Sequence, residues 1–125
     1  MKYLGVDFGL RRVGLAVSDG SIASPFKTLE VKNFSDAVEK IIQITQKENF
    51  SNLIVGLPEG KIGKTVMGFI NALKKRGFNV TASDETLSSQ QAISDMIAQN
   101  IPKEKRKVSD AVAAAIILQQ FLDSK

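Results

Sequence analysis

Short, largely apolar segments separated by turn residues mark the first part of the chain. Residues 2–8 ("KYLGVDF") and 12–19 ("RVGLAVSD") carry apolar and β-branched side chains, a pattern that predicts two strands. The four residues from Phe8 to Arg11, with Gly9 among them, can form the hairpin turn between these strands. Part of residues 24–31 ("SPFKTLEV") predicts a third strand. The chain is therefore expected to open with an antiparallel meander.

From residue 34 onward, helical and strand patterns alternate. Residues 34–46 have apolar side chains at helical spacing, with Ser35 as the expected N-cap. Residues 52–57 ("NLIVGL") are continuously apolar, which predicts a strand that is buried on both faces. The helical spacing returns at residues 66–73, and Gly77 is expected to end that helix.

The remaining segments continue the alternation. Residues 78–83 predict a strand, and residues 88–99 predict a helix that begins with the spacing of a capping box. The last helix is expected from about Ser109 to Leu122. The order β-β-β-α-β-α-β-α-α predicts an α/β fold whose mixed five-stranded sheet combines an antiparallel meander with parallel strands and has helices on both faces.

The composition narrows the possible chemistry. With 125 residues, 43% of them hydrophobic, the chain is expected to form a single domain over residues 1–125. The absence of cysteine and histidine excludes disulfides, Cys/His zinc sites and Ser-His-Asp triads. Any catalysis must therefore use carboxylates, lysines, arginines, hydroxyl groups or a bound ion. The formal charge of +4 favours a polyanionic partner.

The apolar pattern predicts no membrane segment. No apolar run approaches the ~20 residues that a membrane span requires, and the first residues lack the pattern of a signal peptide. We therefore expect a cytoplasmic protein.

Carboxylates stand where two predicted strands end. Asp7 lies at the carboxyl end of the first strand, and Asp84 and Glu85 directly follow the strand at residues 78–83. In an α/β sheet this edge opens into the crevice where ligands usually bind. For Asp7 taken alone, the alternative is a turn-forming aspartate beside Gly9.

A further acid lies on the last predicted helix. Asp110 shares a helical stripe with Ala114, Ile117 and Phe121, and this stripe is expected to face the sheet. Asp110 alone could serve only as a favourable charge near the start of a helix.

These acids together favour a metal site. Clustered carboxylates repel one another unless a cation holds them, and an oxygen-rich site suits Mg²⁺ or Mn²⁺. Two such ions ~4 Å apart would support phosphodiester hydrolysis. Because successive strand residues point to opposite faces, we expect only one of Asp84 and Glu85 to join Asp7 and Asp110 as a direct ligand. We select Glu85, with Asp84 in support.

At this point the chain resembles the YqgF/RuvX family of Holliday junction resolvase-like proteins. The resemblance rests on four blocks that together cover most of the chain: "GVDFGLRRVGLAVSD", "LIVGLPEGKIG", "DETLSSQQA" and "SDAVAAAIILQQFL". It implies an RNase H-like fold and a divalent-metal nuclease that matures the 5′ end of pre-16S ribosomal RNA. Resolution of branched DNA is the alternative that it implies.

The resemblance also assigns residues. The acidic positions of the family fall on Asp7, on the pair Asp84 and Glu85, and on Asp110. Its basic hairpin residue falls on Arg12, which is therefore expected to bind nucleic acid. Two departures affect the substrate side of the site. Thr86 replaces the usual arginine of the third block, and the loop after Pro58 lacks the expected polar sequence.

Basic residues near the acids are candidates for nucleic-acid binding. Lys103, Lys105, Arg106 and Lys107 come shortly before Asp110, in a segment that is either a solvated charge run between helices or a clamp for phosphates. Lys61 and Lys64 are likewise expected in a loop that is either solvated or in contact with a nucleic-acid backbone. With one tyrosine and no tryptophan, recognition of backbone and shape should dominate over base stacking.

Three other functions compete with the nuclease. The first is a nucleotide hydrolase, because the segment "PEGKIGKT" is similar in sequence to a phosphate-binding loop. However, Pro58 stands where that loop requires glycine, and proline supplies no N–H donor. An actin- or hexokinase-type ATPase needs two such domains, and this chain has room for one. A nucleic-acid-binding module without cleavage remains possible. A junction resolvase would act as a symmetric dimer, so both monomer and homodimer stay open.

Overall fold

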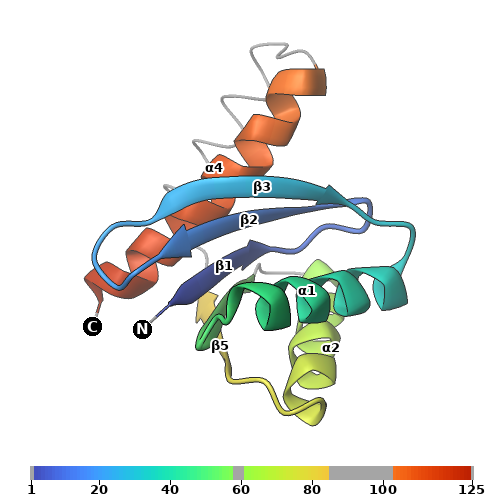
Figure 1. Ribbon diagram of the computed structural model, residues 1–125. Coiled ribbons are helices and arrows are strands. Elements are labelled where there is room, and N and C mark those ends of the chain that lie inside the picture. The colour runs from blue at the N-terminus through green and yellow to red at the C-terminus, as the bar shows by residue number, and fades with distance from the viewer. Residues whose placement is uncertain (1, 58–60, 85–102, 125) are drawn as a thin grey trace.

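Five strands form one mixed sheet in the order β3-β2-β1-β4-β5, shown in the computed structural model of Figure 1. The structure describes residues 2–57, 61–84 and 103–124, and only the backbone of Lys61, Asp84 and residues 103–109. The strands are β1 (Tyr3–Asp7), β2 (Arg12–Ser18), β3 (Ser24–Glu30), β4 (Asn52–Leu57) and β5 (Val80–Asp84). The helices are α1 (Phe34–Glu48), α2 (Lys61–Lys75) and α4 (Lys103–Asp123).

The strand directions confirm the predicted combination of meander and parallel strands. β2 is antiparallel to both β1 and β3, whereas β4 is parallel to both β1 and β5. The hairpin turn occupies residues 8–11, as predicted. Glycine is required at position 9, because a Cβ there would overlap the carbonyl oxygen of Arg12. The helix predicted at residues 88–99 lies outside the described residues.

The sheet has a different apolar core on each face. Figure 1 shows α1 and α2 on one side of the sheet and α4 on the other. Alternation along β4 illustrates the division, since Leu53 and Val55 pack in the α1/α2 core and Ile54 packs in the α4 core. The predicted burial of this strand on both faces is therefore confirmed.

The α1/α2 core holds most of the large apolar side chains. Its buried members are Leu4, Val6, Phe8, Val13, Leu15, Val31, Ala37, Val38, Ile41, Ile42, Phe50, Leu53, Val55, Val66, Phe69, Ile70, Leu73 and Val80. The α4 core is smaller and richer in alanine. Its buried members are Tyr3, Ala16, Ile54, Ala114, Ala115, Leu118 and Leu122. In the described ranges, no helix is both long and apolar enough to cross a membrane.

Two helices begin at different residues from those predicted. The N-cap of α1 is Asn33, not Ser35: its backbone is extended and its side-chain oxygen accepts a 2.8 Å hydrogen bond from the N–H of Asp36. α4 begins at Lys103 rather than near Ser109. Lysine, arginine and glutamate are strong helix formers, so the basic segment extends the helix instead of forming a loop before it.

The start of α2 also corrects the sequence analysis. Lys61 and Lys64 were expected in a loop, yet both lie in α2. A phosphate-binding loop needs non-helical backbone that wraps its N–H groups around the phosphates. Because the backbone is already helical from Lys61, this segment does not have the conformation of a phosphate-binding loop.

Glycines in β1 and β2 bring α4 unusually close to the sheet. A Cβ on Gly14 would overlap the carbonyl oxygen of Asp110. A Cβ on Gly5 would lie 2.8 Å from the Cβ of Leu118 and 3.0 Å from the carbonyl oxygen of Ala114. These glycines leave space for the backbone of α4, so they fix both its depth and its position along the strands.

The close approach of α4 to β2 predicts that one methyl group added at position 14 will strongly lower stability. Gly14→Ala should lower the free energy of unfolding by about 3 kcal/mol, the upper end of the usual range for overpacking, because helix backbone must move. Gly68→Ala is the control: Gly68 lies in α2, where an added Cβ would approach only the ring of Phe34, at 3.9 Å. This control should gain about 0.5–1 kcal/mol from helix propensity. Urea unfolding of both variants measures the difference, and equal stability would contradict the packing described here.

Candidate functional site

Asp7 ends β1 on the face that α4 covers. Tyr3 belongs to the α4 core and Gly5 contacts Leu118, so alternation assigns Asp7 to the same face. The next residue, Phe8, packs on the opposite face, with its ring centroid 4.7 Å from that of Phe69. Phe8 thereby anchors the strand end from which the carboxylate projects.

Asp110 reaches the same place from α4. Its carbonyl oxygen lies directly over Gly14, and Gly14 is the register partner of Asp7 in the antiparallel β1/β2 pair. Residues paired in this way have Cα atoms about 4.5–5.5 Å apart. Two acids separated by about a hundred positions in the sequence are therefore brought to one end of one face of the sheet. Asp110 was predicted close to the start of its helix, and this is wrong. It lies about two turns after the start of α4.

Arg12 forms an ion pair with Asp110. The Nε of Arg12 lies 3.1 Å from Oδ2 of Asp110, and the two side chains are 35% and 27% exposed. The contact meets the distance of an ion pair but not the geometry of a hydrogen bond, since the buried Oδ2 has no hydrogen-bond partner in the described part of the chain. Local sequence patterns do not predict this contact between Arg12 and a candidate metal ligand, because the two residues are far apart in the chain.

Burial raises the pKa of Asp110 above its usual value of 3.8. Loss of solvent disfavours the charged carboxylate, and the nearby Arg12 guanidinium opposes this effect by attraction. Burial is the larger of the two effects. Within the described part of the chain, Arg12 therefore does not fully compensate the charge of Asp110.

The donors present here suit a hard divalent cation. A buried carboxylate oxygen without a hydrogen bond, beside a second acid on the same face, matches the oxygen ligands that Mg²⁺ and Mn²⁺ prefer. Within residues 2–57, 61–84 and 103–124, no group of three acidic side chains is assembled that could hold a metal. Of the predicted ligands, Glu85 lies outside these ranges, as does the side chain of Asp84.

The remaining basic candidates lie on different elements. Lys64 is exposed near the start of α2, which packs on the face opposite α4. Because β1 and β4 are parallel, the segment that leads from β4 to α2 starts at the sheet edge where Asp7 lies. Lys105, Arg106 and Lys107 belong to the first turns of α4, and their side chains, like that of Lys61, are outside the described part.

Gly14 is the residue of this site that the sequence analysis missed. It holds no ligand, but it lets Asp110 lie against the register partner of Asp7. A glycine inside an apolar strand is a known sign of close backbone approach, so "RVGLAVSD" did contain a usable signal.

The sheet order and the placement of helices on both faces define an α/β protein with the RNase H-like fold. Solved structures with this fold include "T. thermophilus RuvC in complex with Holliday junction substrate", with a TM-score of 0.64, 15% identity, and coverage of 99% of this chain and 94% of that one. The fowlpox virus Holliday junction resolvase has a TM-score of 0.63 at 12% identity, with full coverage of both chains. At these identities the likeness shows the fold.

The chain belongs to the RuvX family, because the family model described as "RuvX: Holliday junction resolvase" matches residues 1–124. A relative from Endomicrobium trichonymphae is 37% identical, over 98% of this chain and 95% of its own length. A relative from Fusobacterium nucleatum subsp. nucleatum is 40% identical, over 99% of this chain and 98% of its own length. Both are named "Putative pre-16S rRNA nuclease". The family resemblance seen in the sequence is thus confirmed.

The raised pKa of Asp110 has a measurable consequence for stability. A carboxyl group whose pKa is higher in the folded state favours folding when protonated and opposes it when ionised, so its contribution worsens as pH rises above about 3.8. In metal-free protein, Asp110→Asn should therefore be more stable than the unmodified chain at pH 7. The lost ion pair with Arg12, being partly exposed, should cost at most about 1 kcal/mol.

Urea unfolding in the presence of a chelator, at pH 7 and near pH 4, measures this effect. The advantage of the Asp110→Asn variant should shrink at the lower pH, where the unmodified carboxyl group takes up its proton. Asp123→Asn, at the exposed end of α4, is the control for removing one negative charge from the same helix. A variant advantage that grew toward pH 4 would show that ionised Asp110 stabilises the fold.

Proposed function

We propose that this chain is a divalent-metal-dependent nuclease that hydrolyses phosphodiester bonds during maturation of the 5′ end of pre-16S ribosomal RNA in the cytoplasm. The observation that carries this proposal is the buried Oδ2 of Asp110, which has no hydrogen-bond partner in the described part of the chain. The carbonyl oxygen of the same residue lies over Gly14, the register partner of Asp7. Membership of the RuvX family and the names of the relatives support it.

Asp7, Glu85 and Asp110 are the proposed ligands of Mg²⁺ or Mn²⁺. Glu85 directly follows β5, and β5, β4 and β1 are parallel, so their carboxyl ends reach the same edge of the sheet. The register partner of Asp84 is Leu57, which packs against the α1/α2 core. Strand alternation therefore favours Glu85 over Asp84 for the α4 face, with Asp84 in a supporting role.

The chain contributes geometry and charge to the reaction. A bound divalent ion would supply an activated water and neutralise charge on the leaving oxygen. Asp110 keeps its place because its backbone lies against Gly14, and Asp7 keeps its place through the anchoring of Phe8. Arg12, beside Asp110, has N–H donors that match phosphate oxygens.

We further propose that basic residues on two helices contact the nucleic-acid backbone. Lys105, Arg106 and Lys107 lie in α4, about one helical turn before Asp110. Lys61 and Lys64 lie at the start of α2, which follows the same sheet edge. Contacts of this kind set the register of a nucleic acid without reading its sequence.

A branched-DNA resolvase is the second candidate function. The fold is shared over nearly the whole chain with RuvC in complex with a Holliday junction and with a viral junction resolvase. Such cleavage would need two copies related by a two-fold axis. Cleavage of precursor ribosomal RNA and of a four-way DNA junction, assayed side by side with the oligomeric state, separates the two substrates.

Loss of one proposed ligand should abolish cleavage and spare binding. Asp7→Asn removes an anionic ligand from a hard cation, so metal-dependent cleavage of the precursor RNA should fall by at least about 10²-fold. Glu85→Gln and Asp110→Asn should behave alike, because one site fails whichever ligand is lost. RNA affinity, measured by filter binding, should change by less than about threefold, since cationic side chains supply most of it.

The matched control is Asp19→Asn, an exposed aspartate in the connection from β2 to β3. It removes the same charge and should leave cleavage unchanged. A mock purification measures contaminating nucleases. Equal activity of Asp7→Asn and the unmodified chain would show that Asp7 is not a metal ligand and serves only in the turn. A nucleic-acid-binding module without cleavage would then explain the chain better.

The basic start of α4 gives a prediction about salt. Replacing Lys105, Arg106 and Lys107 by alanine preserves helix propensity and removes three cations. If these residues bind phosphates, the slope of log affinity against log salt should become shallower by about 2–3. The control replaces Lys74, Lys75 and Arg76, an equal charge at the far end of α2. Equal slopes for the two triple variants would show that the basic segment of α4 is solvated and does not bind phosphates.

A further inference from the structure

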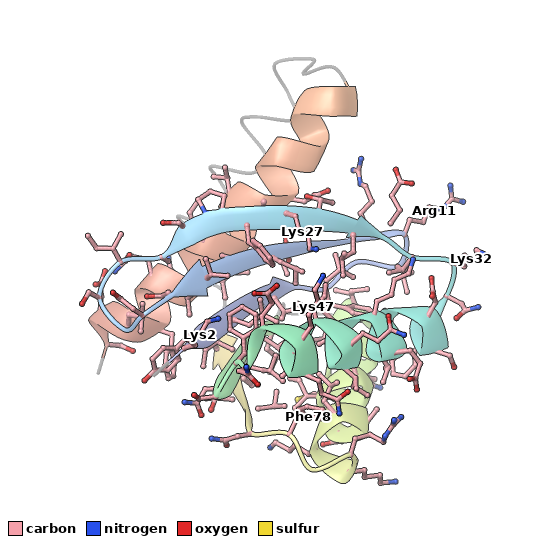
Figure 2. All side chains as sticks on the ribbon, in the orientation of Figure 1. Lys2, Arg11, Lys27, Lys32, Lys47 and Phe78 are labelled. Carbon is pink, nitrogen blue, oxygen red and sulfur yellow. The ribbon has the colours of Figure 1, made fainter. Side chains whose placement is uncertain are left out.

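The backbone of Arg12 is fixed, so only its side chain can change position. Arg12 is the first residue of β2 and is paired in register with Glu30 of β3. The carbonyl oxygen of the preceding residue, Arg11, accepts a 2.9 Å hydrogen bond from the N–H of Val31. The hairpin is thus held between β1 and β3, at the end of the sheet where Figure 2 labels Arg11 and Lys32.

Within the residues that the structure describes, the guanidinium of Arg12 uses little of its binding capacity. Its Nε contacts Oδ2 of Asp110, and among the described residues its two terminal nitrogens form no ion pair or hydrogen bond. A fully engaged arginine binds a carboxylate or phosphate through two parallel N–H groups. The contact with Asp110 is therefore a weak one, and the terminal N–H groups can bind a phosphate.

The Oδ2 atom in this contact belongs to a proposed metal ligand. A guanidinium 3.1 Å from that oxygen and a divalent cation bound to it would repel each other. Arg12 and a metal ion thus compete for Asp110. A phosphate removes this competition, because it can accept the two N–H bonds that the carboxylate does not.

We propose that Arg12 couples metal binding to nucleic-acid binding. In the metal-free chain Arg12 is the counter-ion of Asp110, and a nucleic-acid phosphate draws it away and opens the carboxylate to the metal. Coupling of this kind is reciprocal, so a bound metal also frees Arg12 for the phosphate. Arg12 acts on the metal through Asp110 and is a positioning residue. The inference rests on the proposed function, since it requires Asp110 to be a metal ligand.

Calorimetric titration of Ca²⁺, with and without a saturating fragment of precursor ribosomal RNA, tests the coupling without relying on activity. Ca²⁺ takes the same hard oxygen ligands, and a gel after each titration shows whether the RNA is intact. In the unmodified chain, RNA should tighten Ca²⁺ binding by about tenfold, within the usual range for coupled sites. Arg12→Gln should bind Ca²⁺ about tenfold more tightly than the unmodified chain without RNA, and should lose most of the further gain on adding RNA.

The matched control is Arg11→Gln. Arg11 is exposed, lies in the same hairpin and has no ion pair among the described residues. This change removes the same charge, so it should leave the coupling within about twofold of that of the unmodified chain. Should Arg12→Gln fail to fold, Arg12→Lys keeps the charge without the planar fork and should also weaken the coupling.

The outcomes separate this inference from the proposed function. Ca²⁺ binding that Asp110→Asn does not weaken would overturn the metal site, and the inference with it. Binding that depends on Asp110, but with Arg12→Gln matching Arg11→Gln both with and without RNA, would overturn the role of Arg12 and leave the nuclease proposal intact.

Discussion

The direct contact between the backbone of α4 and the strands β1 and β2 is the constraint on which the site depends. Side chains of the α4 core separate most of this helix from the sheet, but Gly5 and Gly14 let its backbone come close to the strands at two points. The carbonyl oxygen of Asp110 thereby lies against the register partner of Asp7. One added methyl group at position 14 would change the depth of the helix and the relation between the two acids.

The larger apolar core and the candidate site lie on opposite faces of the sheet. The α1/α2 face carries the larger core, including the packed rings of Phe8 and Phe69 just beyond Asp7. The α4 face has a smaller core of alanines and a few larger side chains, and it carries the acids at its edge. The strand end can bear a half-buried carboxylate because the opposite face holds that end in place.

The charge of Asp110 is only partly compensated among the described residues. Burial raises the pKa of Asp110, and Arg12 compensates only part of the cost through one poorly aligned contact. An incompletely compensated carboxylate is an unfavourable feature in a structural role, whereas it is well suited to a ligand site. The proposed transfer of Arg12 from the carboxylate to a phosphate follows from the same imbalance.

The sequence by itself determined the elements and their order. Continuous apolarity in β4 and helical spacing in α1 depend only on local pattern, and both agree with the structure. Positions at the ends of predicted elements indicated Asp7 and Asp110 as candidate site residues, and the family blocks added Arg12. Tertiary structure decided what local pattern cannot encode. The pairing of Arg12 with Asp110 and the contact of α4 with Gly14 join segments about a hundred residues apart, and their geometry follows from backbone packing. The start of α4 at Lys103 was missed because strong helix formers outweighed an unfavourable charge at the helix terminus, a balance that no spacing rule resolves.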